Sequence, residues 1–304
     1  PNILAHAELI TPDTAATAFG VGAGYAFWRW LKQPTWGRAG FAGVLLGFAQ
    51  ISKMSWLLLF GLWPALWMVW QVSGRPPGIA KRRQAFQLTA ILLLGLYVLN
   101  LGYVFDGSFM QLKEFTFISE TLASEEHAGE GGNRFADSWL GELPVPVPEQ
   151  YLLGFDLQKR DFEDHGQPSY LRGEWRDRGW WYYYLYGCLV KVPHGTQLLF
   201  ILAVVLTLFQ AIPKASATHQ PAEQSQRGPS RRDELVLLAP AVALFALVSS
   251  QTEFSHHFRY VLPSLGILMI FLGKPILGLI GGFRSVASEE PFIEDISHGG
   301  PLHA

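Results

Sequence analysis

The stretch FQLTAILLLGLYVLNLGYVF, residues 86–105, decides the class of the fold. Its 20 positions contain no charged residue, while Lys81, Arg82 and Arg83 stand shortly before it and Asp106 directly follows it. A helix needs about 20 mainly apolar residues to cross the hydrocarbon core of a bilayer, because each residue adds only about 1.5 Å along the axis. This stretch therefore predicts a transmembrane helix.

Six further apolar stretches lie on either side of this helix. They are residues 14–31, 39–51, 55–71, 196–212, 235–250 and 260–280. Charged residues make up 16% of the chain, against about 25% in a typical soluble domain. The sequence therefore predicts an all-α integral membrane protein with about seven transmembrane helices.

Basic residues are concentrated in three of the predicted loops, and such loops tend to remain in the cytoplasm. The three groups are Arg29, Lys32 and Arg38; Arg75, Lys81, Arg82 and Arg83; and Lys214, Arg227, Arg231 and Arg232. Alternating helices place all three loops on one side of the membrane. The opposite, extracytoplasmic side then receives Asp13, Lys53 and residues 106–195 and 252–259.

The chain divides into four regions. Residues 1–105 contain the first four helices, and residues 106–195 form a long extracytoplasmic segment of mixed or irregular structure. Residues 196–283 contain the last three helices, and residues 284–304 form a polar cytoplasmic tail that we expect to be disordered. Residues 180–192, near the end of the long segment, are aromatic but too short for a span, which favours a juxtamembrane segment at the interface.

Charge and cysteine content exclude several classes of site. The net charge is −2, which gives no general attraction for nucleic acid. Cys188 is the only cysteine, so a disulfide framework and a cysteine-based metal site are excluded. The chain opens on Pro1 without a signal peptide, and we expect it to be a fragment whose first membrane helices are missing.

Asp13, in the sequence Thr11-Pro12-Asp13-Thr14, precedes the first predicted helix. Its local sequence favours a helix N-cap, because an Asp side chain accepts hydrogen bonds from the N–H groups of a first turn. The alternative is a carboxylate at the mouth of a membrane cavity, and the two interpretations are compatible.

Two cations are candidates for a phosphate site on the same side. Lys53, between two short apolar stretches, either extends its ammonium group to lipid headgroups or binds a lipid phosphate. Arg259 directly precedes the last predicted helix, and the planar fork of a guanidinium group matches phosphate geometry. An Arg at a cavity mouth opposite Asp13 and Lys53 is costly without a partner, which favours a functional role.

The remaining candidates lie close to these residues or in the long segment. His256, His257 and Tyr260 surround Arg259, but two adjacent histidines cannot face one way on a helix, so we expect no metal site there. Arg172 and Glu174 precede the aromatic run of residues 180–184, a mixture that suits either a sugar-binding surface or a solvated loop.

Several motifs, taken in order, resemble the C-type multi-pass glycosyltransferases, namely the bacterial branch of the protein O-mannosyltransferase and aminoarabinose-transferase-like family. They are PNILAHAELITPD (1–13), ISKMSW (51–56), YLRGE (170–174), GWWYYY (179–184), KVP (191–193) and HHFRYVLP (256–263). The resemblance covers nearly the whole chain up to about residue 280.

This resemblance implies an activity: inverting transfer of a sugar from a polyprenyl-phosphate donor to a protein or glycolipid acceptor outside the cytoplasm, in a bacterial inner membrane. It implies that Lys53 and Arg259 bind the donor phosphate and that Asp13 supports the site. Arg172 and Glu174 would then line the acceptor side. The catalytic carboxylate of the family is expected before Pro1. The cofactor stays open, with a divalent metal ion as one candidate.

Two other classes of protein remain open. A transporter or flippase for a lipid-linked or anionic solute would also gather polar groups at one face, although it would usually place ionisable residues near the midplane. A structural subunit of an envelope complex would not require Asp13, Lys53 and Arg259 to converge. The sequence preceding Pro1 would discriminate best among these classes.

Overall fold

The structure is a computed structural model that describes residues 12–72, 80–163, 168–211, 230–250 and 257–275. The chain is mostly helical with little strand. Each of the seven predicted stretches contains a helix. These helices are α2 (Asp13–Lys32), α3 (Trp36–Ser52), α4 (Leu58–Val72), α5 (Lys81–Gly102), α9 (His194–Ala211), α10 (Arg231–Ser250) and α11 (Leu262–Phe271). The all-α part of the prediction is therefore supported.

Three of these helical segments are long and apolar enough to span a membrane: Met54–Val72, Lys81–Gly102 and Arg231–Ser250. The first of them joins the short 3-10 helix η1 (Met54–Leu57) to α4. A fourth candidate is a bent pair in which α8 (Tyr183–Lys191) meets α9 at 115°. By length and composition, three or four segments among the described residues could thus span a membrane, fewer than the seven predicted from the sequence.

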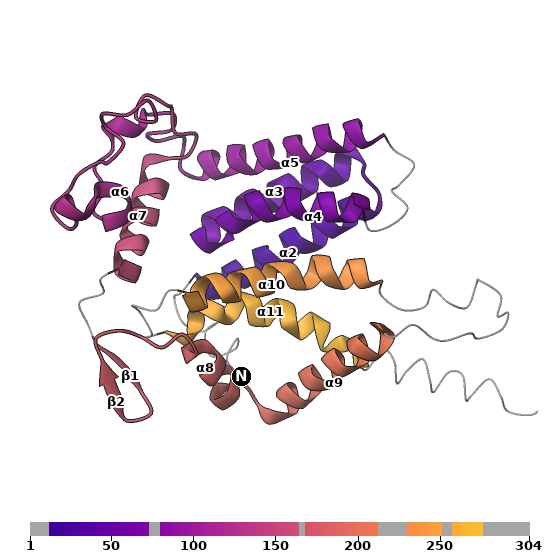
Figure 1. The fold of residues 1–304 in the computed structure, drawn as a ribbon. Helices are drawn as coiled ribbons and strands as arrows, with labels where there is room; N and C mark the ends of the chain where they lie inside the picture. The colour runs from indigo at the N-terminus through magenta and orange to yellow at the C-terminus, as the bar shows by residue number, and fades with distance from the viewer. Residues whose placement is uncertain (1–11, 73–79, 164–167, 212–229, 251–256, 276–304) are drawn as a thin grey trace, which may run out of the picture.

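Helix α2 lies at the centre of the bundle and packs against α3, α4, α10 and α11, while α5 covers the far side of α3 (Figure 1). The α3–α5 contact is close because small residues face each other. A Cβ atom on Gly47 would lie 2.9 Å from the carbonyl oxygen of Gly95. Small residues serve this purpose in membrane helices because they let two backbones approach.

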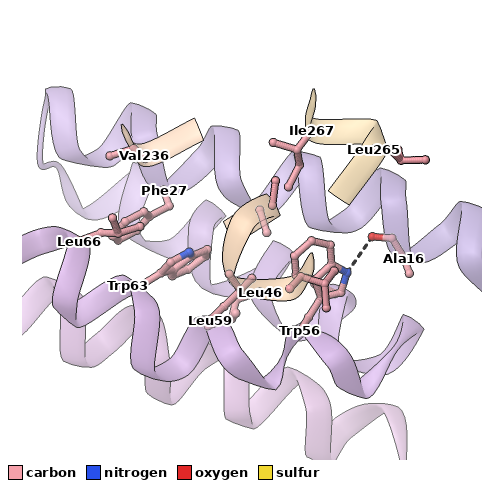
Figure 2. Close-up of a cluster of buried hydrophobic side chains, with 14 of the residues drawn as sticks. Ala16, Phe27, Leu46, Trp56, Leu59, Trp63, Leu66, Val236, Leu265 and Ile267 are labelled. Carbon is pink, nitrogen blue, oxygen red and sulfur yellow. Dashed lines mark hydrogen bonds between the residues drawn. The ribbon is translucent and has the colours of Figure 1, made fainter. Parts of the chain in front are cut away.

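Tryptophan side chains fill the space between α2 and α4 (Figure 2). The indole of Trp56 is fully buried and donates to the carbonyl oxygen of Ala16 at 2.8 Å. The Trp63 ring stacks on Phe27 with centroids 4.4 Å apart and planes 6° apart. These rings are large apolar groups whose only polar atom needs one partner, so they suit a dry helix interface.

The bundle has two chemically different ends. At one end, the C-terminus of α2 meets the N-terminus of α10, where Asp233 accepts from Trp28 at 2.7 Å and pairs with Lys32 at 2.8 Å. Arg232 lies 5.3 Å from the centre of the Trp70 ring at the end of α4. We call this the basic end. At the other end, the first residue of α2 meets the start of η1 and the residues before α11. We call this the Asp13 end.

A separate small module follows α5 at the Asp13 end. It contains η2 (Leu112–Glu114), α6 (Glu120–Ala123), η3 (Glu125–His127) and α7 (Glu149–Glu163). Phe115, Phe117 and Ala123 form its own buried core. The Asp156 carboxylate on α7 accepts from the backbone N–H groups of Ile118 and Ser119 at 2.7 and 3.0 Å. Within the module, these hydrogen bonds fasten the start of α6 to α7, and the two helices lie side by side in Figure 1.

The remainder of the long segment is a hairpin and a short helix. Strands β1 (Ser169–Leu171) and β2 (Glu174–Arg176) pair antiparallel. Arg172 and Gly173 form the two-residue turn with φ of 55° and 90°, the backbone expected of a type I′ hairpin turn. By length and composition the bent pair α8–α9 fits either a broken span or a re-entrant loop, so the placement of residues 180–192 at the interface stays a prediction. The tail 284–304 lies outside the described residues.

Candidate functional site

Asp13 and Lys53 form a buried ion pair at the Asp13 end. The Lys53 ammonium donates to Asp13 Oδ1 at 2.5 Å, and the side chains are 2% and 10% exposed for Asp13 and Lys53. The N-cap interpretation of Asp13 is wrong: Pro12 occupies the cap position and α2 has no side-chain cap hydrogen bond. Asp13 is instead the first residue of the helix, where a negative charge still interacts favourably with the helix dipole.

Arg259 is a second cation beside the same carboxylate. It lies in η4 (Phe258–Val261), and its Nε atom is 3.9 Å from Asp13 Oδ2. Within the described part of the chain, this oxygen is buried without a hydrogen-bond partner. The trio consists of two cations and one carboxylate, a formal net charge of +1. The Arg259 side chain is 37% exposed and is therefore reachable by a ligand.

The Tyr260 ring joins the two cations. The Lys53 ammonium lies 5.0 Å from its centre and the Arg259 guanidinium 5.8 Å. A cation over an aromatic face is attracted by the ring quadrupole. On another side, Phe162 of α7 meets Tyr260 edge to face at 6.3 Å. Tyr260 therefore links the cations of the bundle to α7.

A cavity of about 330 Å³ opens beside this trio, and we call it the polar cavity for the four charged side chains among its lining residues, although most of its lining area is apolar. Asp13, Lys53, Arg259 and Tyr260 line it from the bundle, together with residues 50–52, Met54 and Tyr103. The opposite wall is α7, which contributes Gly154, Leu157, Gln158 and Asp161. The cavity thus lies between the helix ends and the outer module.

A second cavity of about 540 Å³ adjoins the first and is mostly apolar in its lining. Its walls come from η1, α4, α7 and α10, and include Leu57, Leu58, Phe155, Phe162 and Leu247. Lys53, Met54, Gln158 and Tyr260 line both cavities. The two cavities therefore share a cation, a thioether, an amide and an aromatic ring.

The environment of Lys53 makes its ammonium group easier to deprotonate than that of an exposed lysine. Burial lowers the pKa of the Lys53 ammonium below its usual 10.5, and the charge of Arg259 lowers it further. The hydrogen bond and the charge of Asp13 act in the opposite direction without cancelling the shift. The protonated form is thus held mainly by Asp13, and an added anion would stabilise it further.

The other predicted residues that the structure describes do not line these cavities. Arg172 lies in the hairpin turn, with its guanidinium 5.9 Å from the centre of the Tyr186 ring. Glu174 is exposed on β2 and pairs with Arg176 at 3.1 Å. His257 contacts the Tyr260 ring at 6.0 Å but is not among the residues that line the polar cavity. His256 lies outside the described residues.

Helix α7 supplies site residues that the sequence analysis missed. A signal was present: Pro148 precedes the helix, Glu149 stands in its first turn, and apolar side chains recur at helical spacing at Tyr151, Leu152 and Phe155. The Tyr151 hydroxyl donates to Gln50 Oε1 at 3.1 Å. Burial and then the neighbouring Tyr103 raise the pKa of Tyr151, so the hydroxyl remains a donor.

The described residues contain no group of three or more His, Cys, Asp or Glu side chains arranged to hold a metal ion. Comparison of the chain with protein-family models, with curated proteins and with solved structures gave no match. The resemblance to membrane glycosyltransferases therefore stays a prediction that depends on the motifs of this sequence.

Proposed function

We propose that this chain is part of a multi-pass membrane glycosyltransferase that takes a sugar from a polyprenyl-phosphate donor, with inversion, and gives it to a protein or glycolipid acceptor. In this proposal seven helices span the inner membrane of a bacterium. The Asp13 end faces outward and the basic end faces the cytoplasm. The gathering of Lys32, Arg232 and the end of α4 at one end supports that orientation.

The observation that carries the proposal is the junction of the two cavities. A polyprenyl phosphate is an anionic headgroup on a long apolar tail. The polar cavity offers Lys53 and Arg259 to such a headgroup, and the adjoining cavity offers apolar walls from α4, α7 and α10 to the first part of the tail. A soluble anionic solute has no apolar tail to fill the second cavity.

Each residue of the trio has a distinct role in this proposal. Arg259 and Lys53 bind the phosphate oxygens, whose negative charge grows as the glycosidic bond breaks, and this charge stabilisation lowers the barrier. Asp13 holds Lys53 in position and limits the cost of burying it. The base that takes the proton from the acceptor hydroxyl is not one of these three residues; the resemblance to the family implies that it lies in the region before Pro1. Arg172 and Glu174 remain candidates for the acceptor side.

The proposal is tested by comparing two lipids that differ only in their headgroup. Purified protein in lipid nanodiscs should bind polyprenyl phosphate at least tenfold more tightly than the uncharged polyprenol, as measured by tryptophan fluorescence. Arg259→Ala should remove most of this difference, because a hydrogen bond to a charged group contributes about 1.5–3 kcal/mol, or roughly 10–100-fold in affinity. Arg259→Lys should retain part of it, because a lysine keeps the charge but not the two-pronged geometry.

A suitable control is Arg176→Ala, which removes an exposed guanidinium of the hairpin that lines neither cavity. It should leave both affinities unchanged. In the full-length enzyme, sugar transfer should fall in the order wild type, Arg259→Lys, Arg259→Ala at equal membrane levels. Equal binding of the phosphate and the alcohol by the wild-type protein would contradict the proposed function.

A further inference from the structure

Helix α7 presents two polar side chains to the cavity from the side opposite the cations. Gln158 and Asp161 are three residues apart, so they lie on one face of the helix. Both line the polar cavity, which Arg259 and Lys53 line from the bundle. Asp161 also interacts electrostatically with Tyr260, a residue of the opposite wall. One cavity thus has a cationic wall and a wall with an amide and a carboxylate.

The two walls suit different parts of one ligand. A phosphate group is attracted by Lys53 and Arg259 and repelled by a carboxylate, so Asp161 is poorly suited to face it. Hydroxyl groups, by contrast, donate to a carboxylate and both donate to and accept from an amide. The pair that Asp161 makes with Arg160 at 3.1 Å is about half exposed, and the carboxylate retains further acceptor positions.

Several contacts fix the α7 wall relative to the bundle. Tyr151 donates to Gln50, and Gln50 Nε2 donates to the Trp56 carbonyl oxygen at 2.9 Å. A Cβ atom on Gly154 would lie 3.1 Å from the Met54 methyl group, so α7 approaches η1 closely. Near the other end of α7, Phe162 meets Tyr260. A wall held in this way positions its polar groups before a ligand arrives, which lowers the cost of binding.

We propose that Gln158 and Asp161 form a sugar subsite, in which the amide and the carboxylate bind hydroxyl groups of the sugar that the polyprenyl phosphate bears. This inference rests on the proposed function, since it needs the phosphate at the cationic wall. It assigns recognition of the sugar to the outer module and recognition of the phosphate to the membrane bundle. The choice among sugars is thereby separated from the binding of the carrier lipid.

The test measures the affinity that the sugar adds to the bare phosphate. Polyprenyl phosphate, polyprenyl-phosphate mannose and polyprenyl-phosphate glucose are titrated into the protein in nanodiscs. At least one sugar lipid should bind the wild-type protein about tenfold more tightly than the bare phosphate. Each of Gln158→Ala and Asp161→Ala should reduce this ratio, and the double variant should bring it to about one. Binding of the bare phosphate should stay within about threefold of wild type, which also shows that the variants are folded.

Asp137→Ala is the matched control, because it removes an exposed carboxylate that lines neither cavity. It should keep the wild-type ratio. A double variant that keeps the tenfold ratio, or a wild-type protein that gains nothing from either sugar, would overturn the subsite while leaving the phosphate site intact. Failure of the wild-type protein to bind even the bare phosphate would instead overturn the proposed function, so the two failures are distinguishable.

Discussion

Two buried lysine–carboxylate pairs stand at opposite ends of the bundle, and they resemble each other closely. Asp13–Lys53 lies at the Asp13 end, and Glu234–Lys274 lies at the basic end, each with 2.5 Å between nitrogen and oxygen. The Glu234 and Lys274 side chains are 9% and 7% exposed, much like those of the first pair. A buried charge pair is therefore not by itself a sign of a ligand site.

The difference lies in what surrounds each pair. Lys274 also donates to the Thr207 hydroxyl at 2.7 Å, so this cation pairs with one carboxylate and hydrogen-bonds to one neutral group. The nearby cavity of about 350 Å³ is almost entirely apolar. Asp13, in contrast, faces two cations and keeps an oxygen without a hydrogen-bond partner in the described structure. The surplus cation and the polar cavity, rather than burial, distinguish the candidate site.

The largest expected effect concerns the Glu234–Lys274 pair. Lys274→Ala leaves a buried carboxylate without its cation, which should lower the free energy of unfolding by about 3–5 kcal/mol. The double variant Glu234→Leu/Lys274→Met should recover most of this loss, because it removes both charges and keeps apolar volume. Reversible unfolding in detergent would measure both changes. Polyprenyl phosphate binding by the double variant should match wild type. A loss of binding by this variant would contradict the conclusion that only the Asp13–Lys53 pair belongs to a ligand site.

A smaller effect is expected from Gly20, which lies on α2 between the two pairs. A Cβ atom there would be 1.9 Å from Trp56 Cζ2, and Trp56 is held by its hydrogen bond to Ala16. Gly20→Ala should therefore cost about 1–3 kcal/mol of stability through overpacking. Because Trp56 follows Lys53 by three residues, the displacement should also weaken phosphate binding.

Gly24 provides the control for this substitution, since a Cβ atom at that position meets nothing within 4 Å. Gly24→Ala should be neutral or slightly stabilising, because alanine loses less conformational entropy than glycine in a helix. Thermal unfolding of the two variants side by side would measure the difference. Equal melting temperatures would mean that the Trp56 contact is loose and does not connect the centre of the bundle to the site.

The smallest expected effect is a local pH dependence in the outer module. Burial would raise the pKa of Glu163, but hydrogen bonds from Thr121, Lys159 and the backbone of Glu120, together with the Lys159 charge, leave the pKa below 4.5. A carboxylate with a depressed pKa stabilises the fold above the pKa of the unfolded chain and loses this contribution as pH falls through the folded value.

Amide exchange of Glu120 and Thr121, corrected for intrinsic rates, should therefore become faster below about pH 4.5. Glu163→Gln should remove the pH dependence of protection at these two amides, while protection of the α5 amides stays the same. Protection at Glu120 and Thr121 that does not change between pH 6 and pH 3 would show that the Glu163 contacts do not hold this loop.

Helices in the seven apolar stretches were predictable because an apolar run is a strong local signal, but only three or four of the described segments are long and apolar enough to span a membrane. The convergence of Asp13, Lys53 and Arg259 was predictable from sidedness, since alternation puts all three at the same end. Their pairing was not: Asp13 was expected to cap its own helix, whereas a lysine 40 residues further along the chain binds it instead. Local propensity contains no information about such a distant partner.

For α7 the helix itself was predictable from the sequence, but the role of its side chains was not. Its start signal was present in the sequence, yet Gln158 and Asp161 stand out only once α7 is seen against the helix ends. Arg172 and Glu174 were noticed because they stand among aromatics, and the structure places them on a hairpin with partners of its own. Residues in loops are hard to assign because the tertiary docking, not the local pattern, decides what they contact.

The separate core of the outer module has a consequence for how this protein can change. Phe115, Phe117 and Ala123 pack among themselves and not with the core of the bundle. The module is linked to the bundle by contacts outside this core: Tyr151 donates to Gln50, Phe162 meets Tyr260, and Asn100 donates to the Pro146 carbonyl oxygen. Substitutions within the core of the module therefore need not repack the core of the bundle, so the two parts can vary in sequence independently wherever they do not touch.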